Sequence, residues 1–205
     1  MPPKISPQQA KKAKSSPPPR KLNAERRSRE YLSTSEIKQL CQAARQEPRY
    51  GRRNETLILL MFRHALRASE AISLRWDQVD LNNGLLHVKR IKNGVPSTHP
   101  LRGSELRALR QLQRDVDGAP YVFMSERKAP LASRSVRHII LNAGINAGFT
   151  FPLRPHMLRH STGFYLANKG FDTRAIQGYM GHKDIKNTVP YTQLSATRFN
   201  DFWQD

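Results

Sequence analysis

The chain has little cysteine, few acidic residues and no long apolar run. Among its 205 residues there is one cysteine, Cys41, so no disulfide can form within the chain. The longest strongly apolar run, residues 57–62, is well short of the roughly 20 residues that a membrane-spanning helix needs. The amino end lacks the apolar stretch of a signal peptide. We therefore expect no disulfide framework and no membrane span, and a reducing, cytoplasmic setting.

The shortage of acidic residues leaves a large excess of positive charge. The chain has 35 Lys and Arg against 16 Asp and Glu, which gives a formal net charge of +19. A globular protein tolerates such an excess best when a polyanion neutralises it, so nucleic acid is the first partner to consider. The apolar content of 38% is that of an ordinary folded core. These two features together predict a folded domain that binds nucleic acid.

Charge and proline are concentrated at the amino end. Residues 1–33 hold nine Lys and Arg against Glu25 and Glu30, a net charge of +7 that leaves +12 for the rest. The same region has six of the 14 prolines and too few large apolar side chains to offset the entropy of ordering. We predict that residues 1–31 form a disordered basic tail and residues 32–205 one domain. The tail is either an arm along the phosphate backbone or a solubilising leader.

The spacing of apolar and turn residues predicts a mainly α domain with one small antiparallel β-sheet, an α+β fold. Ser33 and Glu36 form a capping box, which indicates a helix beginning there. The pair Asn93-Gly94 is a hairpin signal and predicts that strands over 85–91 and 95–101 meet at a two-residue turn. Further helices are predicted over 55–66, 69–75 with Ser69 as its N-cap, 103–115, 134–146, 156–168 and 172–180.

Groups that can act on a phosphodiester follow one another along the chain. Attack on this anion needs cations that bind its non-bridging oxygens, and the arginine fork suits that geometry. Arg67 follows an apolar helix, and Arg159 lies one helical turn after His156, so both are candidates. A phenol has a pKa near ~10 and becomes a nucleophile when cations and a histidine activate it. Tyr191, nine residues after His182, is placed for that role.

The predicted hairpin contributes the remaining charged candidates. The leaving 5′ oxygen needs a proton, and Lys92 beside Asn93-Gly94 can supply it from a hairpin tip in the minor groove. Lys89 and Arg90 are predicted to contact DNA phosphates. His160 is predicted to be a supporting neighbour of the site, because a helix should turn it away from the preceding histidine and arginine.

These residues resemble the motifs of the tyrosine recombinases, the lambda-integrase-type family. Four matches carry the resemblance: residues 66–70 (LRASE), Lys92 eight residues before Pro100, residues 156–161 (HMLRHS), and Gly181-His182 followed by Tyr191-Thr192. Together they span residues 34–199. Each match alone is a moderate signal, but four in order at family-like spacing make chance agreement improbable. The resemblance implies the catalytic domain fold of that family.

The resemblance also implies a role for each candidate. Tyr191 would form a 3′-phosphotyrosine with DNA while Arg67, Arg159 and His182 hold the phosphate. The other implied roles are proton transfer for His156, general acid for Lys92 and support of the pocket for Glu70. No metal, ATP or organic cofactor is implied, because the protein-DNA linkage keeps the bond energy for rejoining. The implied partners are double-stranded DNA with specific recombination sites, further copies in a synaptic tetramer, and accessory DNA-bending proteins at the bacterial nucleoid.

The chain departs from the usual family plan at its amino end. Most members carry an amino-terminal helical domain that clamps the far side of the DNA, whereas we expect only the basic tail before Ser33. This abbreviated plan, and residues 87–101, are similar to the fimbrial phase-variation recombinases, which invert a promoter-bearing segment. An apolar stripe of Phe199, Phe202 and Trp203 is a candidate assembly segment.

Inversion of a DNA segment is therefore the function we expect. Three alternatives stay open on the sequence. The first is the integrase or transposase of a small mobile element. The second is a DNA-binding accessory protein that keeps the fold but not the reaction. The third is a topoisomerase with the same cleavage chemistry.

Overall fold

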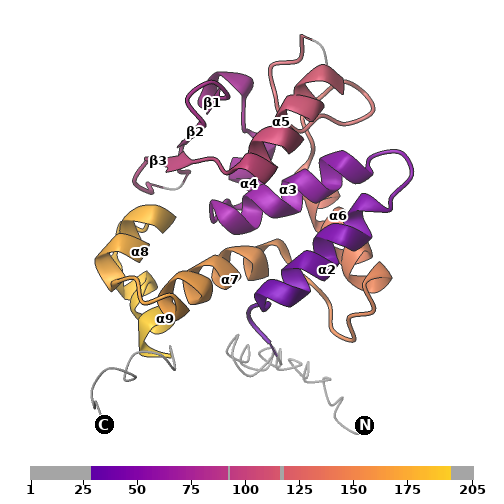
Figure 1. Ribbon diagram of the computed structural model, residues 1–205. Coiled ribbons are helices and arrows are strands. Elements are labelled where there is room, and N and C mark those ends of the chain that lie inside the picture. Colours follow the sequence, from indigo (N-terminus) through magenta and orange to yellow (C-terminus); the bar gives the residue numbers. More distant parts are fainter. Residues whose placement is uncertain (1–28, 92, 116–117, 195–205) are drawn as a thin grey trace, which may run out of the picture.

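The structure is a computed structural model that describes residues 29–91, 93–115 and 118–194. It is mainly helical, with one small antiparallel sheet at one side (Figure 1). The predicted fold class is confirmed. The α-helices are α2 (Thr34–Arg45), α3 (Gly51–Arg63), α4 (Ala68–Ile72), α5 (Gly103–Asp115), α6 (Ser133–Asn146), α7 (Pro155–Asn168), α8 (Thr173–Met180) and α9 (Val189–Gln193). Short 3₁₀ helices cover Trp76–Gln78 and Ile185–Asn187.

Helix α2 begins at the predicted capping box. The Ser33 side chain accepts a hydrogen bond from the Glu36 backbone, and the Glu36 carboxylate accepts one from the Ser33 backbone at 2.8 Å. These bonds satisfy N–H groups that the first helical turn leaves without partners. The buried side of the helix, which includes Ile37, Leu40 and Cys41, packs in the core with α3.

Helix α3 crosses the centre of the core and ends in an unusual turn. Its residues Leu57, Ile58, Leu60 and Met61 have no solvent exposure. The helix ends at Arg63, three residues earlier than predicted, because Ala65 adopts a left-handed conformation with φ of 51°. The Leu66 N–H then bonds to the Met61 carbonyl at 3.1 Å, as in a Schellman turn. Glycine usually occupies this position, so its alanine concealed the turn from the sequence.

The sheet consists of β1 (Val79–Asp80), β2 (Leu85–Val88) and β3 (Ser97–Pro100), paired in that order. Because Val88 pairs with Ser97, the connection covers residues 89–96, and the predicted two-residue turn at Asn93-Gly94 is wrong. The physical reason is that the backbone of this connection bonds to another element instead of forming a tight turn within the hairpin. The Val95 N–H bonds to the Gly181 carbonyl at 3.3 Å, at the end of α8.

The second half of the chain follows the predicted helices closely. Helices α5, α6, α7 and α8 match their predicted bounds to within one residue. Strand β1 and helix α9 were not predicted, since both are too short to show a hydrophobic period. Helix α9 lies beside α7 and α8 (Figure 1), where Tyr191 joins a small apolar cluster with Phe164, Ile176 and Met180. The part of the chain that the structure describes has no helix long and apolar enough to cross a membrane.

Candidate active site

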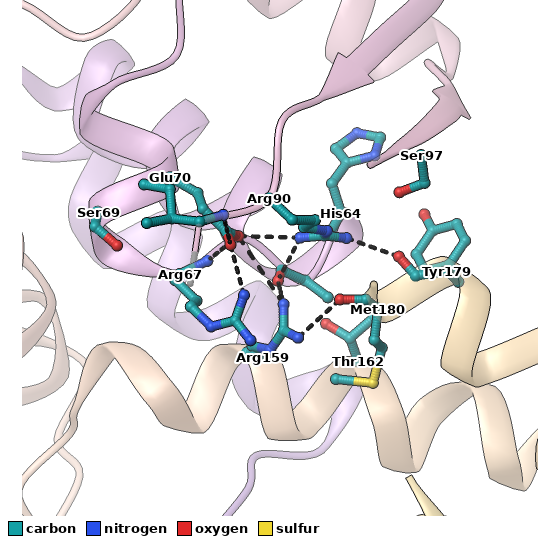
Figure 2. Close-up of polar contacts among 12 residues, drawn as sticks. His64, Arg67, Ser69, Glu70, Arg90, Ser97, Arg159, Thr162, Tyr179 and Met180 are labelled. Atoms are coloured by element: carbon teal, nitrogen blue, oxygen red, sulfur yellow. Dashed lines mark hydrogen bonds and ion pairs between the residues drawn. The ribbon is translucent and has the colours of Figure 1, made fainter. Parts of the chain in front are cut away.

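A buried glutamate, Glu70, forms the centre of the candidate site (Figure 2). Arg67, the N-cap of α4, donates its backbone N–H to this carboxylate at 2.9 Å and its Nη1 at 2.6 Å. Arg90 Nη1 donates at 3.1 Å, the Ile91 N–H at 3.3 Å, and Arg159 Nη1 lies 4.0 Å away. Burial raises the pKa of Glu70, but the backbone bond from Arg67 and the charge of Arg90 outweigh this and lower it overall. Glu70 is therefore ionised and organises three arginines.

The N-cap of α4 differs from the prediction. Helix α4 begins at Ala68 with Arg67 as the N-cap residue, and Ser69 lies inside its first turn. The Glu70 side chain accepts the Arg67 backbone N–H, so one residue both caps the helix and binds the arginine side chain.

Arg159 from α7 is held where two helices end. Its Nη1 donates to the Ala65 carbonyl just after α3, and its Nη2 donates to the Met180 carbonyl at the end of α8 at 2.8 Å. Carbonyl groups at a helix C-terminus carry partial negative charge and attract cations. Burial, together with the charges of Arg67 and Arg90, lowers the pKa of Arg159 to about 9, so it is still charged at neutral pH. The left-handed turn at Ala65 thus directs a carbonyl into the site.

The prediction that Arg90 contacts DNA needs correction. Its side chain has 0% exposure and donates hydrogen bonds to Glu70 and to the carbonyls of His64, Ala65 and Tyr179. Arg90 therefore fixes the β2–β3 connection to α3, α4 and α8 from inside the protein. The adjacent Lys89 is exposed, so its predicted contact with a phosphate is compatible with its position.

Gly181 allows this close packing. It has a φ of +65°, and an added Cβ would lie 2.5 Å from the Val95 carbonyl oxygen and 2.7 Å from Arg90 Cγ. Only glycine meets both requirements. His182 follows directly, and its Nδ1 lies 2.8 Å from the hydroxyl oxygen of the fully buried Thr188. Burial and then the charges of Arg159 and Arg67 lower the pKa of His182 to about 4, which keeps it neutral.

The cluster carries more positive than negative charge. Arg67, Arg90 and Arg159 share one carboxylate, Glu70, so these four side chains have a net charge of 3 − 1 = +2. Burial of charge without compensation is costly, and the lowered pKa values of Arg159 and His182 reflect this strain. The Arg67 side chain is 21% exposed and is the part of the cluster most open to solvent. Such a site has the electrostatics of an anion receptor.

Tyr191 lies beside this cluster and is buried, with 5% exposure. Burial raises its pKa to about 12, although the charge of Arg159 acts in the opposite direction. Its ring lies against α7 at Gly163, where an added Cβ would approach three ring atoms to between 2.7 and 2.8 Å. Its hydroxyl oxygen is 3.0 Å from His160 Nδ1, and its ring is stacked with that of His182 at 6.4 Å.

His160 therefore lies closer to the chemistry than the sequence predicted. Positions four residues apart on a helix share a face, so His160 does not turn away from His156, and their ring centroids are 6.1 Å apart. His156 itself is exposed in the first turn of α7. The separation of four residues could have revealed this arrangement. The role of Gly163 had no signal in the sequence, because the ring it accommodates comes from α9.

Some predicted residues lie outside the described part of the chain. These are Lys92, the stripe of Phe199, Phe202 and Trp203, and residues 1–28 of the basic tail. Their roles stay predictions. In the ranges 29–91, 93–115 and 118–194 the structure shows no group of three or more His, Cys, Asp or Glu side chains that could hold a metal ion.

The phage integrase family matches residues 30–198, which is most of the chain, and the chain belongs to this family. The resemblance to tyrosine recombinases is thereby confirmed. The chain is 42% identical over 188 residues to the type 1 fimbriae regulatory protein FimB of Escherichia coli strain K12, covering 89% of this chain and 94% of that protein. It is 39% identical over 182 residues to FimE of the same strain, covering 86% and 91%. The predicted similarity to fimbrial recombinases is therefore confirmed as well.

Solved structures agree with this assignment. The crystal structure of XerA recombinase superposes with a TM-score of 0.72 at 26% identity, and the match covers 84% of this chain. This chain spans 63% of the solved chain. The fold and the family place the protein among the tyrosine-type DNA recombinases.

Proposed function

We propose that the chain cuts and rejoins double-stranded DNA through a covalent 3′-phosphotyrosine at Tyr191. The observation that carries this proposal is the position of a buried phenol beside a buried cluster with a net charge of +2. A phosphodiester supplies the negative charge that the cluster lacks. It also supplies the phosphorus that the phenol attacks, since attack on phosphate needs positive charge placed before the reaction starts. No cofactor is required, because the phosphotyrosine linkage conserves the energy of the broken bond.

Each candidate then has a defined task. Arg67, the most exposed arginine of the cluster, binds a non-bridging oxygen of the phosphate. The buried Arg159 stabilises the negative charge that develops on the phosphate oxygens during the reaction. His182, held neutral by its surroundings, donates a hydrogen bond to the phosphate. Lys92 protonates the leaving 5′ oxygen, and Glu70 keeps the arginines in place. His156, exposed at the start of α7, assists proton transfer.

We propose inversion of a DNA segment as the biological outcome. The similarity to FimB and FimE, over nearly their whole lengths, supports inversion over integration of a mobile element. The partners are DNA sites at the bacterial nucleoid, further copies of this chain in a synaptic tetramer, and accessory DNA-bending proteins. The Phe199, Phe202 and Trp203 stripe provides aromatic anchors for assembly. A plasmid that carries two inverted sites tests this, because inversion changes its restriction pattern and simple relaxation does not.

Tyr191→Phe tests the nucleophile. The variant keeps the ring that packs on Gly163 and should bind DNA as the wild type does, but it should form no covalent adduct. A nicked suicide substrate traps the adduct, which denaturing electrophoresis detects. Tyr165→Phe is the matched control, since Tyr165 is 39% exposed on α7, and it should form the adduct normally. An adduct in Tyr191→Phe would show that another residue is the nucleophile.

A further inference from the structure

The hydroxyl group of Tyr191 has a defined direction. Gly163 lies under the ring, and Phe164 packs edge-on against it with ring centroids 5.1 Å apart. These contacts leave the hydroxyl oxygen 3.0 Å from His160 Nδ1, which is hydrogen-bond distance. Both His160 and Gly163 belong to α7, so one helix supports the ring and contacts its reactive oxygen.

The chemistry of the two groups allows the phenol to donate this hydrogen bond. Burial raises the pKa of Tyr191 to about 12, so the phenol carries its proton at neutral pH and can donate it. In the imidazole tautomer that carries its proton on Nε2, His160 Nδ1 accepts this hydrogen bond through its lone pair. A neutral imidazole that accepts a hydrogen bond from a nucleophile is the arrangement of a general base.

We propose that His160 is the general base that accepts the proton of Tyr191, an inference that rests on the proposed role of Tyr191 as the nucleophile. As the Tyr191 oxygen bonds to phosphorus, its proton moves to His160 Nδ1. The bond from phosphorus to the 5′ oxygen breaks, and this oxygen takes a proton from the general acid. In rejoining, the 5′ hydroxyl attacks phosphorus and gives its proton back to the general acid, while the tyrosine oxygen leaves and His160 Nδ1 returns its proton to that oxygen.

The other two histidines of the site are placed for different tasks. His182 Nδ1 lies 2.8 Å from the Thr188 hydroxyl oxygen, and the His182 and Tyr191 ring planes are 16° apart with their centroids at 6.4 Å. His156 is exposed, and its ring centroid is 6.1 Å from that of His160. His160 Nδ1, in contrast, lies at hydrogen-bond distance from the Tyr191 oxygen, 3.0 Å.

His160→Asn separates proton transfer from orientation. The Asn oxygen can occupy a position close to that of Nδ1 and accept the same hydrogen bond, but it cannot take up the proton. We expect DNA binding to stay unchanged and single-turnover cleavage of a suicide substrate to fall by about 10²- to 10⁴-fold. The wild-type rate should decrease at acid pH as the imidazole becomes protonated, and this dependence should be absent in the variant. His138→Asn, at an exposed position on α6, is the matched control and should behave as the wild type.

The rate of rejoining tests independently whether His160 returns the proton to the tyrosine oxygen. A DNA strand that ends in a 3′-phosphate p-nitrophenyl ester mimics the covalent intermediate, and p-nitrophenolate leaves without a proton. In a Tyr191→Phe background the 5′ hydroxyl attacks this ester directly, so adding His160→Asn should leave the joining rate unchanged, whereas His160→Asn alone should rejoin the true phosphotyrosine slowly. A folding defect would slow both reactions equally, so this comparison also identifies damage to the site.

Three results would overturn the inference. Cleavage by His160→Asn at the wild-type rate would mean that His160 only orients the phenol. Loss of the acid dependence in His156→Asn instead would assign the base to His156. Nitrogen NMR that found the proton on His160 Nδ1 in the DNA-free protein would reverse the hydrogen bond. Absence of a covalent adduct in the wild type would instead refute the proposed function itself.

Discussion

Lys89 and Arg90 are adjacent basic residues with opposite surroundings. Lys89 is exposed after the end of β2, whereas the Arg90 side chain has 0% exposure and binds Glu70. Successive side chains of extended backbone point to opposite sides, which sends one residue to solvent and the next to the interior. The same type of charge is thus available to solvent at one position and serves internal structure at the next.

Substitution by methionine should separate these two roles. Lys89→Met should reduce the slope of log affinity against log salt by about 0.9, because one phosphate contact is lost. Arg90→Met should leave that slope unchanged but lower the free energy of unfolding by about 3 kcal/mol, since Glu70 loses a buried ion-pair partner. Fluorescence anisotropy over a series of salt concentrations and urea unfolding measure the two quantities. A reduced slope in Arg90→Met would mean that Arg90 reaches DNA after all.

At the scale of elements, helix α7 contributes three of the candidate site residues, His156, Arg159 and His160. Arg159 faces the ends of α3 and α8, while His160 and Gly163 face Tyr191 on α9. The buried Ser161 accepts the Leu32 N–H at 2.8 Å, which ties the segment before α2 to the same helix. A helix with neighbours on nearly all sides holds its side chains within narrow limits, as a site of defined geometry requires.

The β2–β3 connection is bonded to the site at Ile91 and at Val95, on either side of Lys92. The Ile91 N–H bonds to Glu70 at 3.3 Å, and the Val95 N–H bonds to Gly181 at 3.3 Å. An added Cβ on Gly94 would lie 2.8 Å from both the Gly181 carbonyl oxygen and Arg90 Cβ, so this backbone also packs closely. The described residues on either side of Lys92 are therefore fixed next to the arginine cluster.

Lys92→Ala should lose the general acid but keep the phosphate site. Cleavage of an ordinary substrate should fall by about 10²-fold or more. A 5′-bridging phosphorothiolate should restore it, because sulfur leaves without a proton. Arg159→Ala serves as the comparison, since it should lose a similar factor of about 10² and not be restored. Restoration of Arg159→Ala but not of Lys92→Ala would show that Lys92 is not the proton donor.

At the scale of the whole molecule, a set of buried polar side chains connects α3, β3, α5 and α8. His64 Nδ1 lies 3.1 Å from His99 Nδ1, and His64 Nε2 lies 2.8 Å from Glu105 Oε1. The His99 ring stacks on Tyr179 with centroids 3.9 Å apart. Burial, followed by the charges of His64 and Arg90, lowers the pKa of His99 to about 3. This set of side chains fixes β3 to the helical core with His99 in its neutral form.

The free energy of unfolding should therefore decrease as the pH falls below 6.5. The unfolded chain protonates His99 near the ordinary value of 6.5 and the folded chain only near 3, so stability is full above 6.5 and is lost toward 3. From pH 6.5 to 5 this amounts to up to about 2 kcal/mol. Urea unfolding should show that the free energy of unfolding differs less between neutral and acid pH for His99→Gln than for the wild type. The exposed control His138→Gln should match the wild type, and equal pH dependence in all three would exclude His99 as its source.

The sequence by itself determined the elements whose signals are local. The capping box at Ser33 and Glu36 and the apolar spacing of residues 103–115 involve neighbours within one or two turns. The first helix therefore begins where it was predicted to begin, and the second has its predicted bounds. The order and spacing of Arg67, Arg159, His182 and Tyr191 likewise selected candidate residues that are neighbours in the structure. A strongly basic composition was enough to point to DNA.

The tertiary structure decided what depends on contacts between distant segments. Arg159 binds the carbonyl of Ala65, 94 residues away, and Arg90 binds that of Tyr179, 89 residues away. Such partners are backbone groups, which every residue has, so no residue type marks them in the sequence. The burial of Arg90, the left-handed turn at Ala65 and the contact of His160 with Tyr191 likewise depend on how α3, α7, α8 and α9 pack together.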